Sequence, residues 1–299
     1  MSGSALLALL VSCLMWGTTG IVAAGMTPDV STFAIGAFTM GVGGVILAAV
    51  TWSSVRQAWG IRAARPWILW GGLGVLVYPL AFYAGMHDAG VAVGNTVALG
   101  SGPLFAGVIE WVATRRPLKR TWFIALAIAA LGLVFVGIAR GGESQVGATG
   151  VGLALIAGVA YALYSVSGSR VIAAGANFRG AMGAVFGTGA LPLLVVLAVT
   201  GAPLVTQVPN LVRGGYLALG PLVLAYLLFG FALTRASASL VTLVTLLEPV
   251  FATILAVIVL GEALVPIGWV GIGLLVVGVA VATMPQRPTD IPESGASTH

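Results

Sequence analysis

The sequence predicts an all-α integral membrane protein in which ten transmembrane helices form two inverted-topology repeats of five helices each. Composition is the first reason, because 59% of the 299 residues are hydrophobic and only 7% are charged, with a mean hydropathy of +1.10. Soluble domains carry roughly 25% charged residues. The second reason is the number of apolar stretches long enough to span a membrane, and the third is a weak internal repeat.

Each apolar stretch in the first half lies between charged residues, glycines or prolines and is long enough to span a bilayer, which takes about 20 helical residues. The expected helices are residues 4–24, 31–51, 67–86, 91–113 and 121–139. A signal peptide would require a Lys or Arg before the first apolar stretch, and none is present there. Cleavage at Cys13 would also destroy this span. We therefore expect it to be a retained helix.

The second half supplies five further stretches. They are residues 150–167, 179–199, 212–233, 237–260 and 267–284. The ninth expected helix contains Glu248-Pro249 near its middle, and Glu262 follows its end. Residues 285–299 are rich in Pro, Ser and Thr, which favours a disordered tail. These lengths leave no room for an appreciable soluble domain, so we expect one integral membrane domain.

The basic residues separate by side. Ten helices place both termini on one side, and eleven of the thirteen Lys and Arg residues fall in the loops on that side, against Arg140 and Arg213 on the other. Basic residues concentrate in cytoplasmic loops, so we expect both termini in the cytoplasm. The pI near 9.9 is thereby explained by membrane topology, and no nucleic-acid partner is expected.

An internal repeat relates the two halves. Shifting residues 73–136 by 146 positions lays them on residues 219–282 without a gap. The matches include Leu73-Gly74 with Leu219-Gly220, Thr96 with Thr242, Pro103 with Pro249 and Gly132 with Gly278. Because five is an odd number, the second repeat must insert upside down, as in alternating-access transporters with a site near mid-membrane. We therefore assign residues 1–140 to the first repeat, 147–284 to the second and 285–299 to a cytoplasmic tail.

Several motifs carry a resemblance to a known family. They are Met15-Trp16-Gly17-Thr18, the paired proline segments at Pro103 and Glu248-Pro249, the Gly261-Glu262-Ala263-Leu264 turn and the glycine-rich last helix of each half. With them the chain resembles, over essentially its whole length, the drug/metabolite transporter superfamily and in particular its ten-helix EamA-type exporters. Among these it looks most like bacterial exporters of aromatic amino acids. Two departures are a second helix without the arginine that many relatives carry, and Arg116 at the position equivalent to Glu262.

Polar and aromatic residues deep in the spans are the candidates for substrate contacts, because binding sites are mostly apolar with a few placed polar groups. They are Trp16, Tyr78, Tyr83, Asn95, Tyr161, Tyr164, Tyr226 and Glu248. Each Tyr or Trp has the alternative role of an interface anchor or packing residue, which fits Trp16 and Tyr78 least because they lie at mid-span. The residues expected at the membrane interface are Trp52, Trp59, Trp67, Trp111, Trp122 and Trp269.

Prolines inside the spans are expected to free backbone carbonyls, and we assign Pro79, Pro103 and Pro249 to helix kinks and gating. Pro192 and Pro221 are interpreted as kinks fitted to packing. Glu248 leaves three interpretations open: a proton or cation site, a structural hydrogen bond to a neighbouring helix, or a carboxylate facing a water-filled cavity. Glu110 lies about one turn before Arg115-Arg116, which predicts an interfacial salt bridge.

The function expected from these features is export of amino acids, aromatic and other neutral ones, and of related small metabolites, across the bacterial cytoplasmic membrane. The alternative is a proton-coupled exporter of cationic aromatic drugs, and a channel would differ from either by lacking substrate saturation and counterflow. An enzyme is disfavoured because two His and no acidic cluster offer no convergent catalytic groups. We expect no cofactor, metal or ATP use. The expected partners are a small-molecule substrate, the lipid bilayer and, in the alternative, protons, with the chain a monomer or weak homo-oligomer.

Overall fold

The computed structural model describes residues 1–139, 147–261 and 263–284, and within these ranges the chain forms helices and no strand. Ten helical segments are long and apolar enough to cross a membrane, which confirms the predicted fold class. Arg140, Glu143, Glu262, Arg287 and the predicted tail 285–299 lie outside the described residues. The protein is therefore a multi-pass membrane protein built from helices.

The first five spans are partly broken into shorter helices. Span one is α1 (Gly3–Gly17) with α2 (Thr19–Ala24), span two is α3 (Thr32–Ala37), the π-helix η1 (Phe38–Val42) and α4 (Gly43–Val50), and spans three to five are α6 (Arg65–Ala89), α7 (Val91–Thr114) and α8 (Arg120–Ala139). A short helix, α5 (Trp52–Gly60), joins spans two and three. It was not predicted, because it is too short and too polar to cross the membrane.

The second five spans follow the same plan. Spans six and seven are α9 (Ala148–Ala173) and α10 (Phe178–Thr200), span eight is α12 (Val208–Leu217), the π-helix η2 (Ala218–Leu224) and α13 (Ala225–Leu233), span nine is α14 (Ala238–Val244), the 3-10 helix η3 (Thr245–Leu247) and α15 (Glu248–Leu260), and span ten is α16 (Pro266–Thr283). The short α11 (Ala202–Thr206) precedes span eight. Span six continues beyond its predicted end at Ser167 to Ala173, because a helix can extend past the apolar core. In this last part the guanidinium of Arg170 lies over the ring of Trp67.

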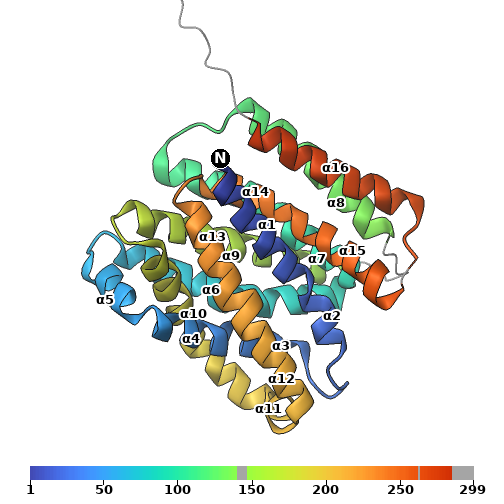
Figure 1. Ribbon diagram of the computed structural model, residues 1–299, viewed down its shortest axis with the longest axis horizontal. Coiled ribbons are helices and arrows are strands. Elements are labelled where there is room, and N and C mark those ends of the chain that lie inside the picture. Colours follow the sequence, from blue (N-terminus) through green and yellow to red (C-terminus); the bar gives the residue numbers. More distant parts are fainter. Residues whose placement is uncertain (140–146, 262, 285–299) are drawn as a thin grey trace, which may run out of the picture.

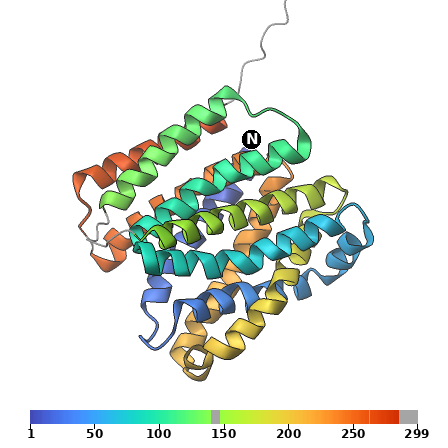
Figure 2. The same cartoon turned by 180° about the vertical axis from the view of Figure 1, so that it is seen from behind.

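Contacts between spans repeat with an offset of five. The third span, α6, packs on α9 of the sixth, and correspondingly α13 of the eighth packs on α1 of the first. Likewise α7 contacts α9, and α15 contacts α1. Two further contacts, α7 with α14 and α8 with α16, each join a span to its own equivalent in the other half. The pair α8 and α16 runs along one edge of the molecule (Figures 1 and 2). Two inverted repeats related by a twofold axis in the membrane plane have this pattern.

The two ends of the bundle differ in where the cavities between the helices lie. We call the side where α1 begins and α16 ends the terminal side, and the opposite side the far side. In the terminal half the helices meet through fully buried side chains, including Leu9 of α1, Ile68 of α6, Ala106 of α7 and Val241 of α14, all 0% exposed. The cavities described next lie at mid-membrane and in the far half. The bundle is therefore closed toward the terminal side.

Candidate functional site

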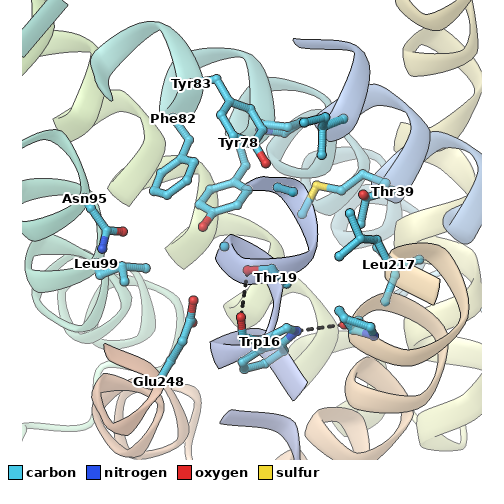
Figure 3. Close-up of a pocket in the computed structure, with 18 of the residues that line it drawn as sticks. Trp16, Thr19, Thr39, Tyr78, Phe82, Tyr83, Asn95, Leu99, Leu217 and Glu248 are labelled. Carbon is cyan, nitrogen blue, oxygen red and sulfur yellow. Dashed lines mark hydrogen bonds between the residues drawn. The ribbon is translucent and has the colours of Figure 1, made fainter. Parts of the chain in front are cut away.

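A cavity of about 310 Å³ lies between the two halves of the chain and extends from mid-membrane toward the far side. Its walls come from spans one to four, six, eight and nine. The eight residues singled out by the sequence all line it: Trp16, Tyr78, Tyr83, Asn95, Tyr161, Tyr164, Tyr226 and Glu248. Figure 3 shows several of them grouped around the same space. The volume is within the usual range of small-molecule sites.

Aromatic rings form a continuous wall of this cavity. The ring of Trp16 lies 5.1 Å from that of Tyr226, which lies 5.9 Å from Tyr164, and Tyr164 lies 5.8 Å from Tyr78. The hydroxyl groups of Tyr164 and Tyr226 are 2.7 Å apart and form a hydrogen bond, and the hydroxyl of Tyr161 bonds to that of Thr245. Tilted and edge-to-face pairs are favourable for aromatic rings. The wall therefore holds its shape through contacts among its own side chains.

The widened turn of η2 gives Trp16 its partner. The N–H of Ala225 bonds to the carbonyl of Gly220, five residues back, and the carbonyl of Pro221 accepts a hydrogen bond of 2.7 Å from the indole Nε1–H of Trp16. Nearby, Ser12 of α1 donates to the carbonyl of Ala225 at 2.9 Å. Carbonyls freed from a helix in the membrane need such partners. Trp16 therefore fastens the first span to the eighth beside the cavity.

Replacing Trp16 with phenylalanine is expected to lower the free energy of unfolding by about 1 kcal/mol, because the Pro221 carbonyl loses its indole donor while a ring remains. For a chain of this size the apparent unfolding temperature should fall by about 2 to 4 °C. The measurement is thermal unfolding in detergent, with Trp52→Phe as the matched control because Trp52 is 59% exposed. Equal unfolding temperatures for the two variants would show that the Trp16 bond contributes no stability.

Glu248 is the one charged side chain among the described residues that line the cavity. It begins α15 directly after the 3-10 turn η3, and the repeat places Gly102 at the equivalent position of the first half. Its carboxylate points into the same space as the Asn95 amide and the Tyr78 hydroxyl (Figure 3). It has no hydrogen-bond or ion-pair partner within the described chain, and no group of three or more His, Cys, Asp or Glu side chains there could hold a metal.

The three prolines assigned to kinks and gating have different surroundings. Pro249 directly follows the interruption at η3 and lines a second cavity, whereas Pro79 and Pro103 lie inside the uninterrupted helices α6 and α7. Each of these two prolines still lacks an N–H donor, so their assignment to kinks and gating stays a prediction. Pro221 was interpreted as a kink fitted to packing. It lies in the π-helix η2, and its carbonyl accepts the hydrogen bond from Trp16.

Other lining residues were missed by the sequence interpretation. They include Thr19, Thr39, Met40 and Phe82. Phe82 stacks on Tyr78 with ring centroids 5.4 Å apart, and its spacing of four residues from Tyr78 in one helix is the signal that would have found it. A second cavity of about 540 Å³ adjoins the first through Gly17, Gly20 and Asn95, and lies between spans one, four, five and nine.

Two expectations near the terminal side are wrong. Within the described residues Glu110 makes no salt bridge with Arg115 or Arg116; its carboxylate instead accepts a hydrogen bond of 2.9 Å from the backbone N–H of Ser239. Trp122, expected at the membrane interface, is 7% exposed and donates its indole N–H to the Ser239 carbonyl at 3.1 Å. Both side chains turn inward because the start of span nine packs between spans four and five.

Comparison with known proteins extends these observations. Over 281 residues the chain is 30% identical to the uncharacterized transporter YwfM of Bacillus subtilis (strain 168), covering 93% of both chains. It is 29% identical over 237 residues to the threonine/homoserine exporter RhtA of Escherichia coli (strain K12), covering 77% of this chain and 76% of RhtA. A crystal structure with 22% sequence identity has the same fold, with a TM-score of 0.76 over 95% of this chain and 97% of the other.

The sequence model of the EamA-like transporter family matches the chain twice, over residues 3–138 and 148–284. Each match covers five of the ten spans, so together they account for nearly all of the described chain. The helical offset seen in the contacts and the two matched segments describe the same pair of halves. On these grounds the chain belongs to the EamA-like transporter family.

Proposed function

We propose that the protein exports amino acids and related small metabolites across the bacterial cytoplasmic membrane by alternating access between its two halves. The observation that carries this proposal is the cavity between the halves, which extends toward the far side above a closely packed terminal half. An alternating-access carrier has one conformation in which the cavity is open to one side of the membrane and a second in which it is open to the other. The basic residues on the terminal side support placing both termini in the cytoplasm, so that the cavity faces outward.

The chemistry of the cavity supports a substrate with an ammonium group. The carboxylate of Glu248 has no partner within the described chain, and the surrounding aromatic faces attract cations. The amide of Asn95 and the hydroxyl of Tyr78 can each donate and accept hydrogen bonds. The name of the relative RhtA, a threonine/homoserine exporter, supports amino acids as the class. Export of aromatic amino acids, alongside other neutral ones, stays a prediction.

Proton-coupled export of cationic aromatic drugs is the second candidate. It is favoured by one observation: none of the described residues lining the cavity is Lys, Arg or His, so a substrate carboxylate meets no opposite charge there. A lone carboxylate within a membrane is a common feature of proton relays. In this case Glu248 would release its proton when the drug binds and regain it after the drug leaves.

The test is transport into liposomes that hold the purified protein. Labelled threonine and labelled tryptophan are offered in counterflow against the same unlabelled amino acid, and a cationic aromatic dye is offered in parallel, each with and without a pH gradient. Saturable amino-acid counterflow without a gradient is the expected result. Dye movement only with a gradient, together with no amino-acid counterflow, would replace the first candidate with the second. Unsaturable flux without counterflow would indicate a channel and contradict both.

A further inference from the structure

The start of span nine is held by side chains from the other half of the protein. Glu110, in the last turns of α7, accepts the N–H of Ser239 at 2.9 Å, and Trp122, near the start of α8, donates to the carbonyl of Ser239 at 3.1 Å. Both backbone polar groups of Ser239 are thus bound by the first repeat, although Ser239 belongs to the second. A carboxylate acceptor makes a hydrogen bond stronger than a neutral one.

These contacts close the terminal side beneath the cavity. Ser239 is 1% exposed, and the neighbouring Val241 and Thr242 are fully buried. The indole of Trp122 also packs on α7, where a Cβ added to Gly107 would lie 2.8 Å from the ring. A passage to the terminal side between spans four and nine therefore requires Ser239 to part from Glu110, Trp122 or both. We call Glu110, Trp122 and Ser239 the terminal latch.

The equivalent positions on the far side, all within the described residues, do not form such a latch. The repeat offset of 146 positions places Ala256 where the first repeat has Glu110, Gly268 where it has Trp122 and Val93 where the second repeat has Ser239. Neither Ala256 nor Gly268 has a polar side chain, so neither can bind the backbone of Val93 as Glu110 and Trp122 bind that of Ser239. If the two repeats exchange conformations, two hydrogen bonds on the terminal side break, and the equivalent side chains Ala256 and Gly268 on the far side form none in return.

We propose that the terminal latch biases the transport cycle, so that the conformation open to the far side predominates when no substrate is bound. This inference rests on the alternating access proposed above. A hydrogen bond to a charged group, such as the partly buried one from Ser239 to Glu110, is worth about 10- to 100-fold in an equilibrium constant. Removing the Glu110 carboxylate should shift the ratio of far-open to terminal-open molecules toward the terminal-open form by about that factor.

The positions equivalent by the repeat provide matched reporters. Ala252 lines the far-side cavity, and its counterpart Ala106 is fully buried in the terminal half. Because Cys13 is the one cysteine of the chain, Cys13→Ala gives a background for Ala252→Cys or Ala106→Cys. In detergent, where both sides are accessible, a water-soluble maleimide should label the cysteine at 252 quickly and the cysteine at 106 slowly. Glu110→Ala should speed labelling at 106 by at least 10-fold and slow it at 252.

Further variants keep the test decisive if Glu110→Ala unfolds. Glu110→Gln retains an oxygen acceptor and should give an intermediate shift, and Trp122→Phe should shift labelling in the same direction. Asp88→Asn is the control, since Asp88 pairs with its neighbour His87 on the far side, and it should leave both rates unchanged. Folded latch variants with labelling within twofold of the background would overturn the inference. Labelling reports the conformation directly and does not depend on the substrate. If the labelling rates shift but the protein transports no amino acid, the inference about the latch holds and the proposed substrate class is refuted.

Discussion

Replacing Glu248 with glutamine is expected to weaken amino-acid transport by about 10- to 100-fold in apparent affinity. The carboxylate is the one charged side chain among the described residues lining the cavity, and it has no partner within the described chain. An ammonium group that leaves water for this aromatic site needs an opposite charge, because desolvation of an unpaired cation is costly. Loss of a charge-assisted hydrogen bond corresponds to about 1.5 to 3 kcal/mol.

The measurement is the concentration dependence of counterflow in liposomes for Glu248→Gln, with Glu248→Asp as the matched variant that keeps the charge. The aspartate should retain part of the affinity, since its carboxylate is one methylene shorter. Thermal unfolding of Glu248→Gln should be unchanged or improved, because no protein hydrogen bond is lost within the described residues. An unchanged transport curve would show that this carboxylate does not contact the substrate.

Replacing Gly132 with leucine is expected to destabilise the fold by about 3 kcal/mol or more. Gly132 of α8 faces α16 so closely that a Cβ there would lie 2.7 Å from both the Gly271 carbonyl oxygen and the Leu275 nitrogen. The same closeness is reciprocal, since a Cβ at Gly271 would lie 2.7 Å from the Gly132 oxygen. Small residues allow such approach in membranes, and backbone atoms cannot move aside as a side-chain end can. The larger residue therefore separates the two helices.

The expected result is a large fall in the unfolding temperature and in the yield of monodisperse protein in detergent. Gly273→Leu is the matched control, because Gly273 lies in α16 with nothing within 4 Å of an added Cβ. It should be neutral or slightly stabilising, since leucine is the better helix former by about 0.5 to 1 kcal/mol. If both variants unfold at the wild-type temperature, the close α8 to α16 packing is not required for stability.

The contacts of the terminal latch could not be predicted from the sequence. The sequence shows that Glu110 lies close to the charged loop. A salt bridge was predicted because Arg115 and Arg116 are the nearest basic residues along the chain. Its actual partner, Ser239, lies in the other half of the protein. Trp122 likewise lies at a span boundary, but it faces a neighbouring helix rather than lipid. Position along the membrane normal is local information, whereas the direction in which a side chain faces depends on which spans pack together.

The ten spans and the family were determined by the sequence alone. Insertion of a helix depends on the summed hydropathy of about 20 consecutive residues, a property of the local sequence. The repeat was also readable, because Pro103 and Pro249 mark equivalent positions in the two halves. Only the tertiary structure decided that the candidate residues share one cavity, that the Pro221 carbonyl accepts a hydrogen bond from Trp16, and that the terminal side is closed. The physical reason is that these features arise from contacts between spans far apart in sequence, whose mutual rotation is set by packing of the whole bundle.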